Sequence, residues 1–147
     1  MDADSRRRRS EFVTRAREFL SSLTTLDNSL LSTFTNAVNA FNAEDWPAVY
    51  ALLDDNVVLT TVDEPKTIRG KDQVTRYLEN KIATDHPALS PIEVNADATT
   101  GVVQGKAFWD DDDNGKRTRR IITYKFVFNW HANEQRWYLL NLWGSPD

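Results

Sequence analysis

The sequence predicts a single domain of the α+β class, with helices first and a curved antiparallel sheet after them. In the first half of the chain, apolar residues recur every three or four positions, which is helical spacing. In the second half, runs rich in β-branched and aromatic residues are separated by turns, and Asn114-Gly115 is a strong hairpin signal. Helices followed by consecutive strands indicate helices packed on one face of a sheet. A length of 147 residues fits one domain.

The composition excludes several classes of protein. The chain has no cysteine, so it cannot hold a disulfide framework, a thiolate nucleophile or a cysteine zinc site. Its formal net charge of −4 argues against nucleic-acid binding, which needs a basic surface. The longest apolar runs, such as Val57–Leu59, are far shorter than the roughly 18 residues that a helix needs to cross a bilayer. No apolar stretch of a secretory signal follows Arg6–Arg9. We therefore expect a cytoplasmic protein that binds neither nucleic acid nor membrane.

Residues 1–26 form a separate N-terminal segment in this interpretation, and residues 27–147 form the folded domain. The segment opens with a basic, solvated arm at Arg6–Arg9. Apolar residues at helical spacing then predict an extra helix from Glu11 to about Ser22.

Three further helices are expected inside the domain. The first begins at Asp27, which can cap it, and ends near Phe41. The second is short and starts at Asp45, an N-cap residue type, with Pro47 in its first turn, where a missing N–H costs nothing. The third covers about residues 71–84 and ends before Pro87.

The rest of the domain predicts strands. A β-branched run indicates one strand between the second and third helices, and four more follow the third helix. Their expected bounds are Val57–Val62, Leu89–Ala98, Val102–Asp110, Lys116–His131 and Arg136–Gly144. The turn at Asn114-Gly115 joins two of them as a hairpin.

Four short motifs occur in a characteristic order along the domain. They are AFNAEDW at Ala40–Trp46, ALLDDN at Ala51–Asn56, IRGKD at Ile68–Asp72 and YLLNLWG at Tyr138–Gly144. In this order they resemble the nuclear transport factor 2-like superfamily over about Leu30 to Gly144. That superfamily has a cone-shaped fold and includes SnoaL-like polyketide cyclases and ketosteroid isomerase. The resemblance implies a sheet that curls around the helices and leaves an open-ended cavity, lined by the concave sheet face and the third helix.

The resemblance also locates the positions at which ketosteroid isomerase carries its catalytic groups. The base position falls on Thr61, the helical tyrosine position on Ala37 and the late-strand acid near Tyr124. None of the three has the family residue type, so ketosteroid isomerase chemistry is not expected. Scytalone dehydratase-like sites use two histidines in the cavity, whereas His86 and His131 both fall in predicted turns and are expected at the surface.

Strand alternation selects the polar groups that could face such a cavity. Tyr124 shares a strand face with apolar residues, and Asn141 shares one with aromatic residues. Asp63 follows the first strand and would have its pKa raised by an apolar cavity, which suits a general base. We therefore predict Asp63 as base, with Tyr124 and Asn141 as hydrogen-bond donors to a substrate oxygen. The remaining predicted substrate-binding residues are Leu59, Thr61, Tyr77, Trp109, Phe126 and Trp143.

Each of these assignments has a purely structural alternative. Asp63 stands before Glu64-Pro65, where an aspartate commonly initiates a turn. Tyr124 and Asn141 are equally well explained as buried polar residues with hydrogen-bond partners inside the core.

No metal or cofactor is expected. Residues 110–115 (DDDDNG) match the opening of an EF-hand calcium loop, but the glutamate required at loop position 12 falls on Ile121 and no helices flank the segment. A charged hairpin tip explains these residues better. Without cysteine, and with both histidines in turns, the available chemistry is that of carboxylates and hydroxyls.

Two functions remain open at this stage. One is a cofactor-free isomerase, cyclase, dehydratase or hydrolase that acts on a small apolar or aromatic molecule. The other is a non-catalytic ligand-binding or assembly domain. An acidic side chain buried in the cavity would favour the enzyme, and a cavity of apolar and neutral groups would favour binding. Nuclear transport itself would need a protein-binding surface that the sequence does not reveal.

A homodimer is also expected, as is common in the family. The outer sheet face would expose apolar residues that are unfavourable in water: Ile121, Thr123, Val127, Tyr138, Leu140 and Leu142.

Overall fold

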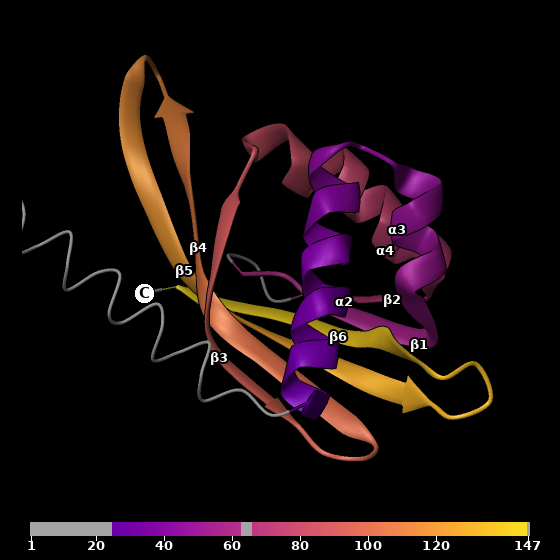
Figure 1. The fold of residues 1–147 in the computed structure, drawn as a ribbon. Coiled ribbons are helices and arrows are strands. Elements are labelled where there is room, and N and C mark those ends of the chain that lie inside the picture. Colours follow the sequence, from indigo (N-terminus) through magenta and orange to yellow (C-terminus); the bar gives the residue numbers. More distant parts are fainter. Residues whose placement is uncertain (1–24, 63–65, 147) are drawn as a thin grey trace, which may run out of the picture.

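The fold was analysed in a computed structural model that describes residues 25–62 and 66–146. The predicted basic arm and extra helix lie outside the described residues. A six-stranded sheet curls around three helices, all of which lie on its concave side (Figure 1). This arrangement is the cone-shaped α+β fold expected from the sequence.

Helices α2 (Thr25–Asn42) and α3 (Trp46–Leu52) are joined by a short turn. Asp45 caps α3 as predicted, because its side chain accepts a hydrogen bond from the Ala48 N–H at 3.3 Å. The sequence predicted that Asp27 would cap α2 from the position before the helix. In the structure Asp27 instead lies in the first turn of α2. Its carboxylate accepts the Ala96 N–H at 2.7 Å and thereby ties α2 to a strand of the sheet.

The predicted helix 71–84 is divided into three types of helix. Its first part is α4 (Lys71–Tyr77), a π-helical turn covers Leu78–Ile82, and a 3₁₀ turn covers Ala83–Asp85. His86 then adopts a left-handed conformation with φ of 48°. The chain ends the helical segment there because Pro87 disfavours helical backbone in the residue before it.

The six strands are arranged in the order β2-β1-β6-β5-β4-β3. The predicted sheet was entirely antiparallel, whereas β1 and β6 pair in parallel and make the sheet mixed. Strand β2 was not predicted, because three residues are too few to show a period. The bounds are β1 Leu53–Thr60, β2 Thr67–Arg69, β3 Ala88–Ala96, β4 Thr100–Asp113, β5 Lys116–His131 and β6 Arg136–Pro146.

The hairpin of β4 and β5 confirms the predicted turn. Asn114 and Gly115 both have positive φ, at 54° and 81°, as a type I′ turn requires. The hairpin extends beyond its neighbours, because pairing with β3 ends at Phe108 and pairing with β6 ends at Ile122. Its tip therefore projects from the body as a two-stranded ribbon (Figure 1).

A β-bulge in β6 changes which side chains face the helices. Phe128 pairs with Leu139 and Val127 pairs with Asn141, so Leu140 is an extra residue without a cross-strand partner. Beyond the bulge, Leu142 lies on the concave face and Asn141 on the outer face. Trp143, which pairs with Lys125, lies on the outer face as well. Uninterrupted alternation predicts the opposite face for all three residues, and those three predictions were wrong.

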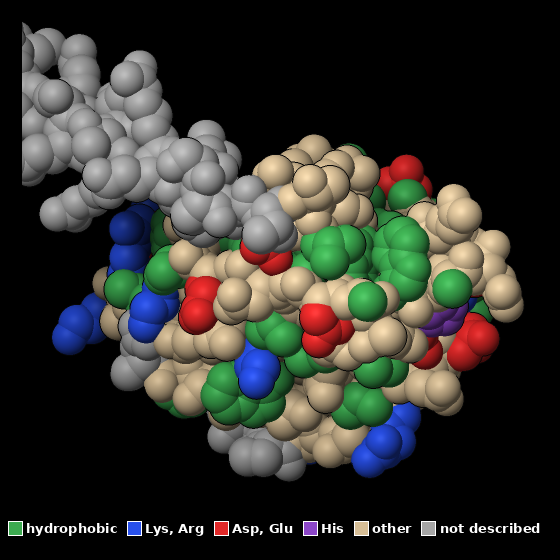
Figure 2. All heavy atoms as spheres, turned by 60° about the horizontal axis from the view of Figure 1, so that its bottom comes forward, with side chains coloured by type: hydrophobic (Ala, Val, Ile, Leu, Met, Phe, Trp, Pro, Cys, Tyr) green, Lys and Arg blue, Asp and Glu red, His purple; other side chains and the backbone are tan. Residues whose placement is uncertain are grey.

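The core fills the space between α2 and the concave sheet face. Phe34 of α2 stacks on Tyr124 of β5 with ring centroids 6.0 Å apart. Buried side chains from every strand except β2 join them. On the face that Figure 2 shows, acidic and basic side chains are mixed, so it carries no extended patch of one charge. No helix of the described residues is long and apolar enough to cross a membrane.

Candidate functional site

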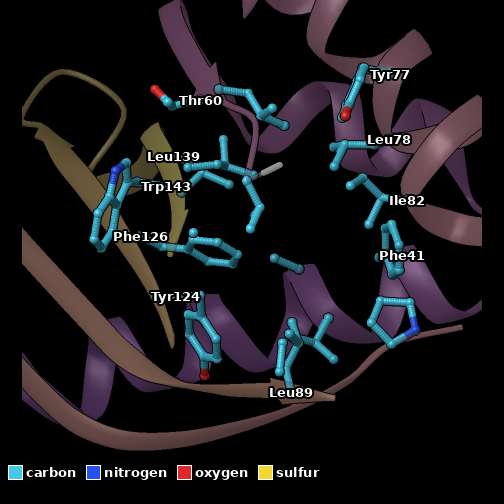
Figure 3. A pocket seen from close by; sticks show the side chains of 18 of the residues that line it. Phe41, Thr60, Tyr77, Leu78, Ile82, Leu89, Tyr124, Phe126, Leu139 and Trp143 are labelled. Atoms are coloured by element: carbon cyan, nitrogen blue, oxygen red, sulfur yellow. The ribbon is translucent and has the colours of Figure 1, made fainter. Parts of the chain in front are cut away.

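A cavity of about 530 Å³ lies between the helices and the concave sheet face. It opens to solvent, and its wall is built mainly of apolar and aromatic side chains from α2, from the helical segment 77–82 and from the sheet (Figure 3). Representative wall residues are Phe34, Phe41, Leu78, Ile82, Phe128 and Leu139.

Most of the residues that the sequence suggested for the site lie on this wall. All of the predicted substrate-binding residues line the cavity: Leu59, Thr61, Tyr77, Trp109, Phe126 and Trp143. Trp143 differs from the others because it pairs opposite Lys125 and is 42% exposed, so it contributes to the edge of the cavity. Of the three predicted catalytic residues, Tyr124 lines the cavity, Asn141 does not, and Asp63 lies outside the described residues.

Asn141 does not line the cavity. It is exposed on the outer face, opposite Val127 of β5 and Val58 of β1, because of the bulge at Leu140. Asp63 lies outside the described residues, between Val62 and Lys66, both of which line the cavity.

Tyr124 lines the cavity with its ring but not with its hydroxyl. The residue is only 2% exposed, and its hydroxyl has no hydrogen-bond partner among the described residues. In Figure 3 the hydroxyl points away from the other labelled side chains, and it lies beside Gly105 of β4. Burial raises the pKa of Tyr124, so the phenol stays protonated. In this orientation it cannot donate a hydrogen bond to a molecule in the cavity, contrary to our expectation.

Trp109 is held in place at the cavity by charged neighbours. Its indole Nε1–H donates to Asp111 Oδ1 at 3.1 Å. The guanidinium of Arg120 lies 5.6 Å from the centre of the Trp109 ring and 3.8 Å from Asp111 Oδ2. These contacts join both strands of the projecting hairpin to one aromatic wall residue.

Three charged side chains on the wall were missed by the sequence analysis: Lys66, Lys81 and Asp85. All three are exposed, so no buried charged side chain lines the cavity among the described residues. Lys81 and Asp85 follow Tyr77 by four and eight residues, which is the helical spacing that could have revealed them. Burial and the nearby charge of Asp111 raise the pKa of Asp85, while Arg120 and His86 oppose the shift.

A separate polar cluster lies on the outer face of the sheet. The carboxylate of Asp54, which is 4% exposed, lies 2.6 Å from Nε2 of His131 and accepts the Asn56 N–H at 2.9 Å. Burial alone would raise the pKa of Asp54, but hydrogen bonds from Asn56, His131 and Asn129 outweigh it, so the pKa is lowered. Both histidines were expected at the surface. His86 is exposed, but His131 is half-buried and paired with Asp54, so the prediction for His131 was wrong.

The acidic run at residues 110–113 belongs to the hairpin. Asp110 lies 3.5 Å from Arg119 on the opposite strand, and Asp112 pairs in register with Arg117. No group of three or more metal-ligating side chains suited to an ion occurs among the described residues.

The cone-shaped sheet and its apolar cavity define a protein of the nuclear transport factor 2-like superfamily, and comparisons with known proteins agree. Residues 34–138 match the SnoaL-like domain family, so the chain belongs to that family. No curated protein is similar enough in sequence to count as a relative.

Several solved structures share the fold. A ketosteroid isomerase-like protein from Erwinia carotovora atroseptica superposes with a TM-score of 0.69 at 19% identity, covering 84% of this chain and 98% of that one. The CaMKII hub of S. rosetta superposes with a TM-score of 0.70 at 15% identity, covering 85% and 99%. An NTF2-like protein from Novosphingobium aromaticivorans gives 0.65 at 12% identity, covering 93% and 88%. At these identities the similarity shows the fold alone.

The positions equivalent to the ketosteroid isomerase groups all lie at the cavity. Ala37, Thr61 and Tyr124, the positions to which the resemblance assigned these groups, line it. Ala37 and Thr61 carry neither the tyrosine nor the carboxylate of that enzyme, and the Tyr124 hydroxyl is directed elsewhere. These three positions therefore line the cavity without carrying that catalytic set.

Proposed function

We propose that this protein binds a small, mainly apolar molecule with a ring system in the cone cavity. The observation that carries the proposal is the cavity itself: about 530 Å³, walled by aliphatic and aromatic side chains, with no buried charged side chain among the described residues. Pockets of 300–1,000 Å³ with few polar groups are typical of small-molecule sites. The sequence analysis expected an enzyme to bury an acidic side chain in the cavity, and no described residue of the wall does so; the charged wall residues Lys66, Lys81 and Asp85 are all exposed.

Burial of apolar ligand surface would supply most of the affinity. Each Å² of apolar area removed from water contributes about 25 cal/mol. The hydroxyl groups of Thr61 and Tyr77 on the wall are the candidates for orienting a polar substituent of the ligand. Phe126 and Trp109 offer aromatic surface to a ring.

A cavity-filling variant tests this proposal. Ala37 lies on α2 and lines the cavity, so Ala37→Trp would place an indole in the space that the ligand needs. The matched control is Ala51→Trp, because Ala51 is exposed on α3. The probe is 2-(1-naphthyl)ethanol, titrated by calorimetry. We expect binding to the wild type and the control, and about 10-fold or greater weakening in Ala37→Trp. Equal affinity in all three proteins would place the ligand outside the cavity.

Catalysis is the alternative use of the same cavity, and it rests on Asp63. Val62 and Lys66, the described residues nearest to Asp63 in the sequence, both line the cavity. We keep Asp63 as the candidate general base but assign no role to Asn141, and none to the Tyr124 hydroxyl. Once a substrate is identified, Asp63→Asn should abolish turnover while leaving substrate binding intact. Unchanged turnover in that variant would show that the base is wrongly assigned.

Assembly into a homodimer is a second proposed property, and the outer sheet face supports it. Ile121 is 45% exposed there and pairs across the hairpin with Phe108, while Val127 and Tyr138 are half-buried on the same face. Leu142 no longer belongs to this set because the bulge turns it inward. Structural similarity to a kinase hub is consistent with an assembly role.

Light scattering tests the homodimer. At micromolar concentration we expect twice the mass of one chain for the wild type and the mass of one chain for Ile121→Glu. The control is Ile92→Glu, because Ile92 is exposed on β3 at the far edge of the sheet. A wild-type protein that is monomeric under these conditions would refute the proposal.

A further inference from the structure

The charges on the cavity wall give information about the ligand that the apolar wall alone does not. Lys66, Lys81 and Asp85 line the cavity, so two cations and one anion face a molecule bound there. Lys81 lies in the π-helical turn between Leu78 and Ile82, and both of these aliphatic neighbours also line the cavity. A cationic group is therefore placed directly beside apolar wall.

The anion among the three is already engaged by other protein charges. The groups that act on the Asp85 carboxyl are Asp111 on β4, Arg120 on β5 and His86 in its own segment. Arg120 also contacts Asp111 and lies over the Trp109 ring. Asp85 thus belongs to a network at the base of the projecting hairpin, where positive charge is already supplied by the protein.

Lys81 is not part of that network. Its ammonium forms no ion pair with any residue in 25–62 or 66–146, and it is not among the charges that act on Asp85. Lys66 adds a second positive charge from the sheet side of the wall, next to Thr61, whose hydroxyl accepts the Lys66 N–H at 2.9 Å. Among the described residues, the lining therefore carries two positive charges, Lys66 and Lys81, and one negative charge, Asp85.

We propose that the molecule bound in the cavity is an apolar acid, whose ring or chain fills the cavity and whose carboxylate lies against the Lys81 ammonium. This inference rests on the proposed binding function and specifies its ligand class. A bound ligand would displace water from the wall around Lys81, and an ion pair strengthens as water leaves. A ligand amine at the same place would instead meet a like charge.

Three isosteric probes separate the possible head groups: 1-naphthylacetate, 2-(1-naphthyl)ethanol and 2-(1-naphthyl)ethylamine. They share one ring system and differ in charge at pH 7. Calorimetry on the full chain should show the acid binding about 3- to 10-fold more tightly than the alcohol, and the amine most weakly. In Lys81→Met the acid should bind only as tightly as the alcohol, while the affinity for the alcohol stays unchanged. That unchanged affinity also shows that the variant is folded.

Lys116→Met is the matched control, because Lys116 is exposed at the hairpin tip, away from the cavity wall. It should leave all three affinities unchanged. Lys66→Met measures the contribution of the second cation and should weaken acid binding by no more than Lys81→Met does.

The outcomes distinguish failure of this inference from failure of the proposed function. If acid and alcohol bind equally well and Lys81→Met changes neither, the ligand class is wrong but the binding function stands. If the amine binds best and Asp85→Asn weakens it, the cavity selects the opposite charge and the inference is overturned. If none of the probes binds the wild type, the binding function itself fails.

Discussion

The two faces of strand β5 differ in how they treat polar groups, although their residues alternate along a single chain segment. The concave face presents Tyr124, Phe126 and Phe128 to the core and cavity, and its buried Tyr124 hydroxyl has no hydrogen-bond partner within residues 25–62 and 66–146. The outer face presents Asn129 and His131, both bound to the buried carboxylate of Asp54. The concave face thus offers mainly apolar contacts, whereas the outer face supplies hydrogen-bond partners even to the buried carboxylate of Asp54. This contrast favours a cavity that binds apolar surface over one that performs acid–base chemistry.

Adjacent residues of β5 give the sharpest test of the contrast, and the largest expected effect. Phe128 is 1% exposed on the concave face, and Phe128→Ala should lower the free energy of unfolding by about 3–5 kcal/mol. Val127 is half-buried on the outer face, and Val127→Ala should cost about 1 kcal/mol. Urea unfolding measures both. Similar losses in the two variants would show that the two faces are not energetically distinct.

Gly105 on β4 tests how tightly the concave face is packed around Tyr124. A Cβ at this position would lie 2.1 Å from the Ser90 carbonyl oxygen and 2.7 Å from the Tyr124 hydroxyl. Since a backbone carbonyl in a paired strand cannot move cheaply, Gly105→Ala should destabilise the protein by about 2–3 kcal/mol. Adding Tyr124→Phe to this variant should recover part of the loss in thermal unfolding. A fully tolerated Gly105→Ala would mean that β3 and β4 are packed less closely than described.

Asp54 tests the outer face through pH. Because hydrogen bonds lower its pKa in the folded state, the ionised carboxylate contributes stability above its unfolded pKa of about 3.9. This contribution is lost as the pH falls through the lower folded-state pKa. Asp54→Asn should therefore cost about 2 kcal/mol at pH 7, and the difference from wild type should shrink below about pH 4.

The pH dependence of chemical unfolding between pH 7 and pH 2.5 provides this measurement. Asp55→Asn is the control, because Asp55 is exposed beside Asp54 and its carboxylate lies 3.9 Å from the Lys71 ammonium, at the limit of an ion pair. A constant difference between wild type and Asp54→Asn across this range would contradict an ionised, hydrogen-bonded carboxylate.

The sequence predicted the facing of side chains correctly where a strand is regular and incorrectly where it is interrupted. Alternation correctly placed Trp109 and Phe126 on the cavity wall, because β4 and β5 pair without interruption over these residues. It failed for Asn141, since one extra residue at Leu140 shifts the phase of β6 and sends each later side chain to the other face. Bulges have no sequence signature strong enough to be foreseen here.

Long-range contacts account for the remaining misses. Asp54 and His131 are separated by 77 positions, so no spacing rule links them, and the turn position of His131 suggested a free surface residue. The π-helical turn at Leu78–Ile82 likewise has no distinguishing composition. The resemblance to the superfamily predicted the cavity and two positions on its wall, Ala37 and Thr61. It could do so because the fold determines which positions face inward.

The Tyr124 hydroxyl, which no described residue hydrogen-bonds, offers a test in which removal of a polar group should stabilise the protein. A buried donor without an acceptor costs free energy, so Tyr124→Phe should raise the free energy of unfolding by about 1 kcal/mol. Because the hydroxyl points away from the cavity, the same variant should leave naphthylethanol binding unchanged. A loss of binding would mean that the phenol does reach the ligand and would revive the role first predicted for it.

Asp85 at the cavity wall is expected to give the smallest effect. Burial and the charge of Asp111 raise its pKa, so ionisation of Asp85 opposes folding and the penalty is present at pH 7. Asp85→Asn should therefore stabilise the protein by a few tenths of a kcal/mol at pH 7, since the side chain is exposed and solvent screens its interactions. The gain should vanish as the pH falls below the unfolded pKa, where wild-type Asp85 is itself neutral. Thermal unfolding at pH 7 and pH 3.5 measures it. A destabilised variant at pH 7 would instead indicate that Arg120 and His86 more than balance the repulsion from Asp111, and that the rim of the cavity, like the outer face, satisfies its charges.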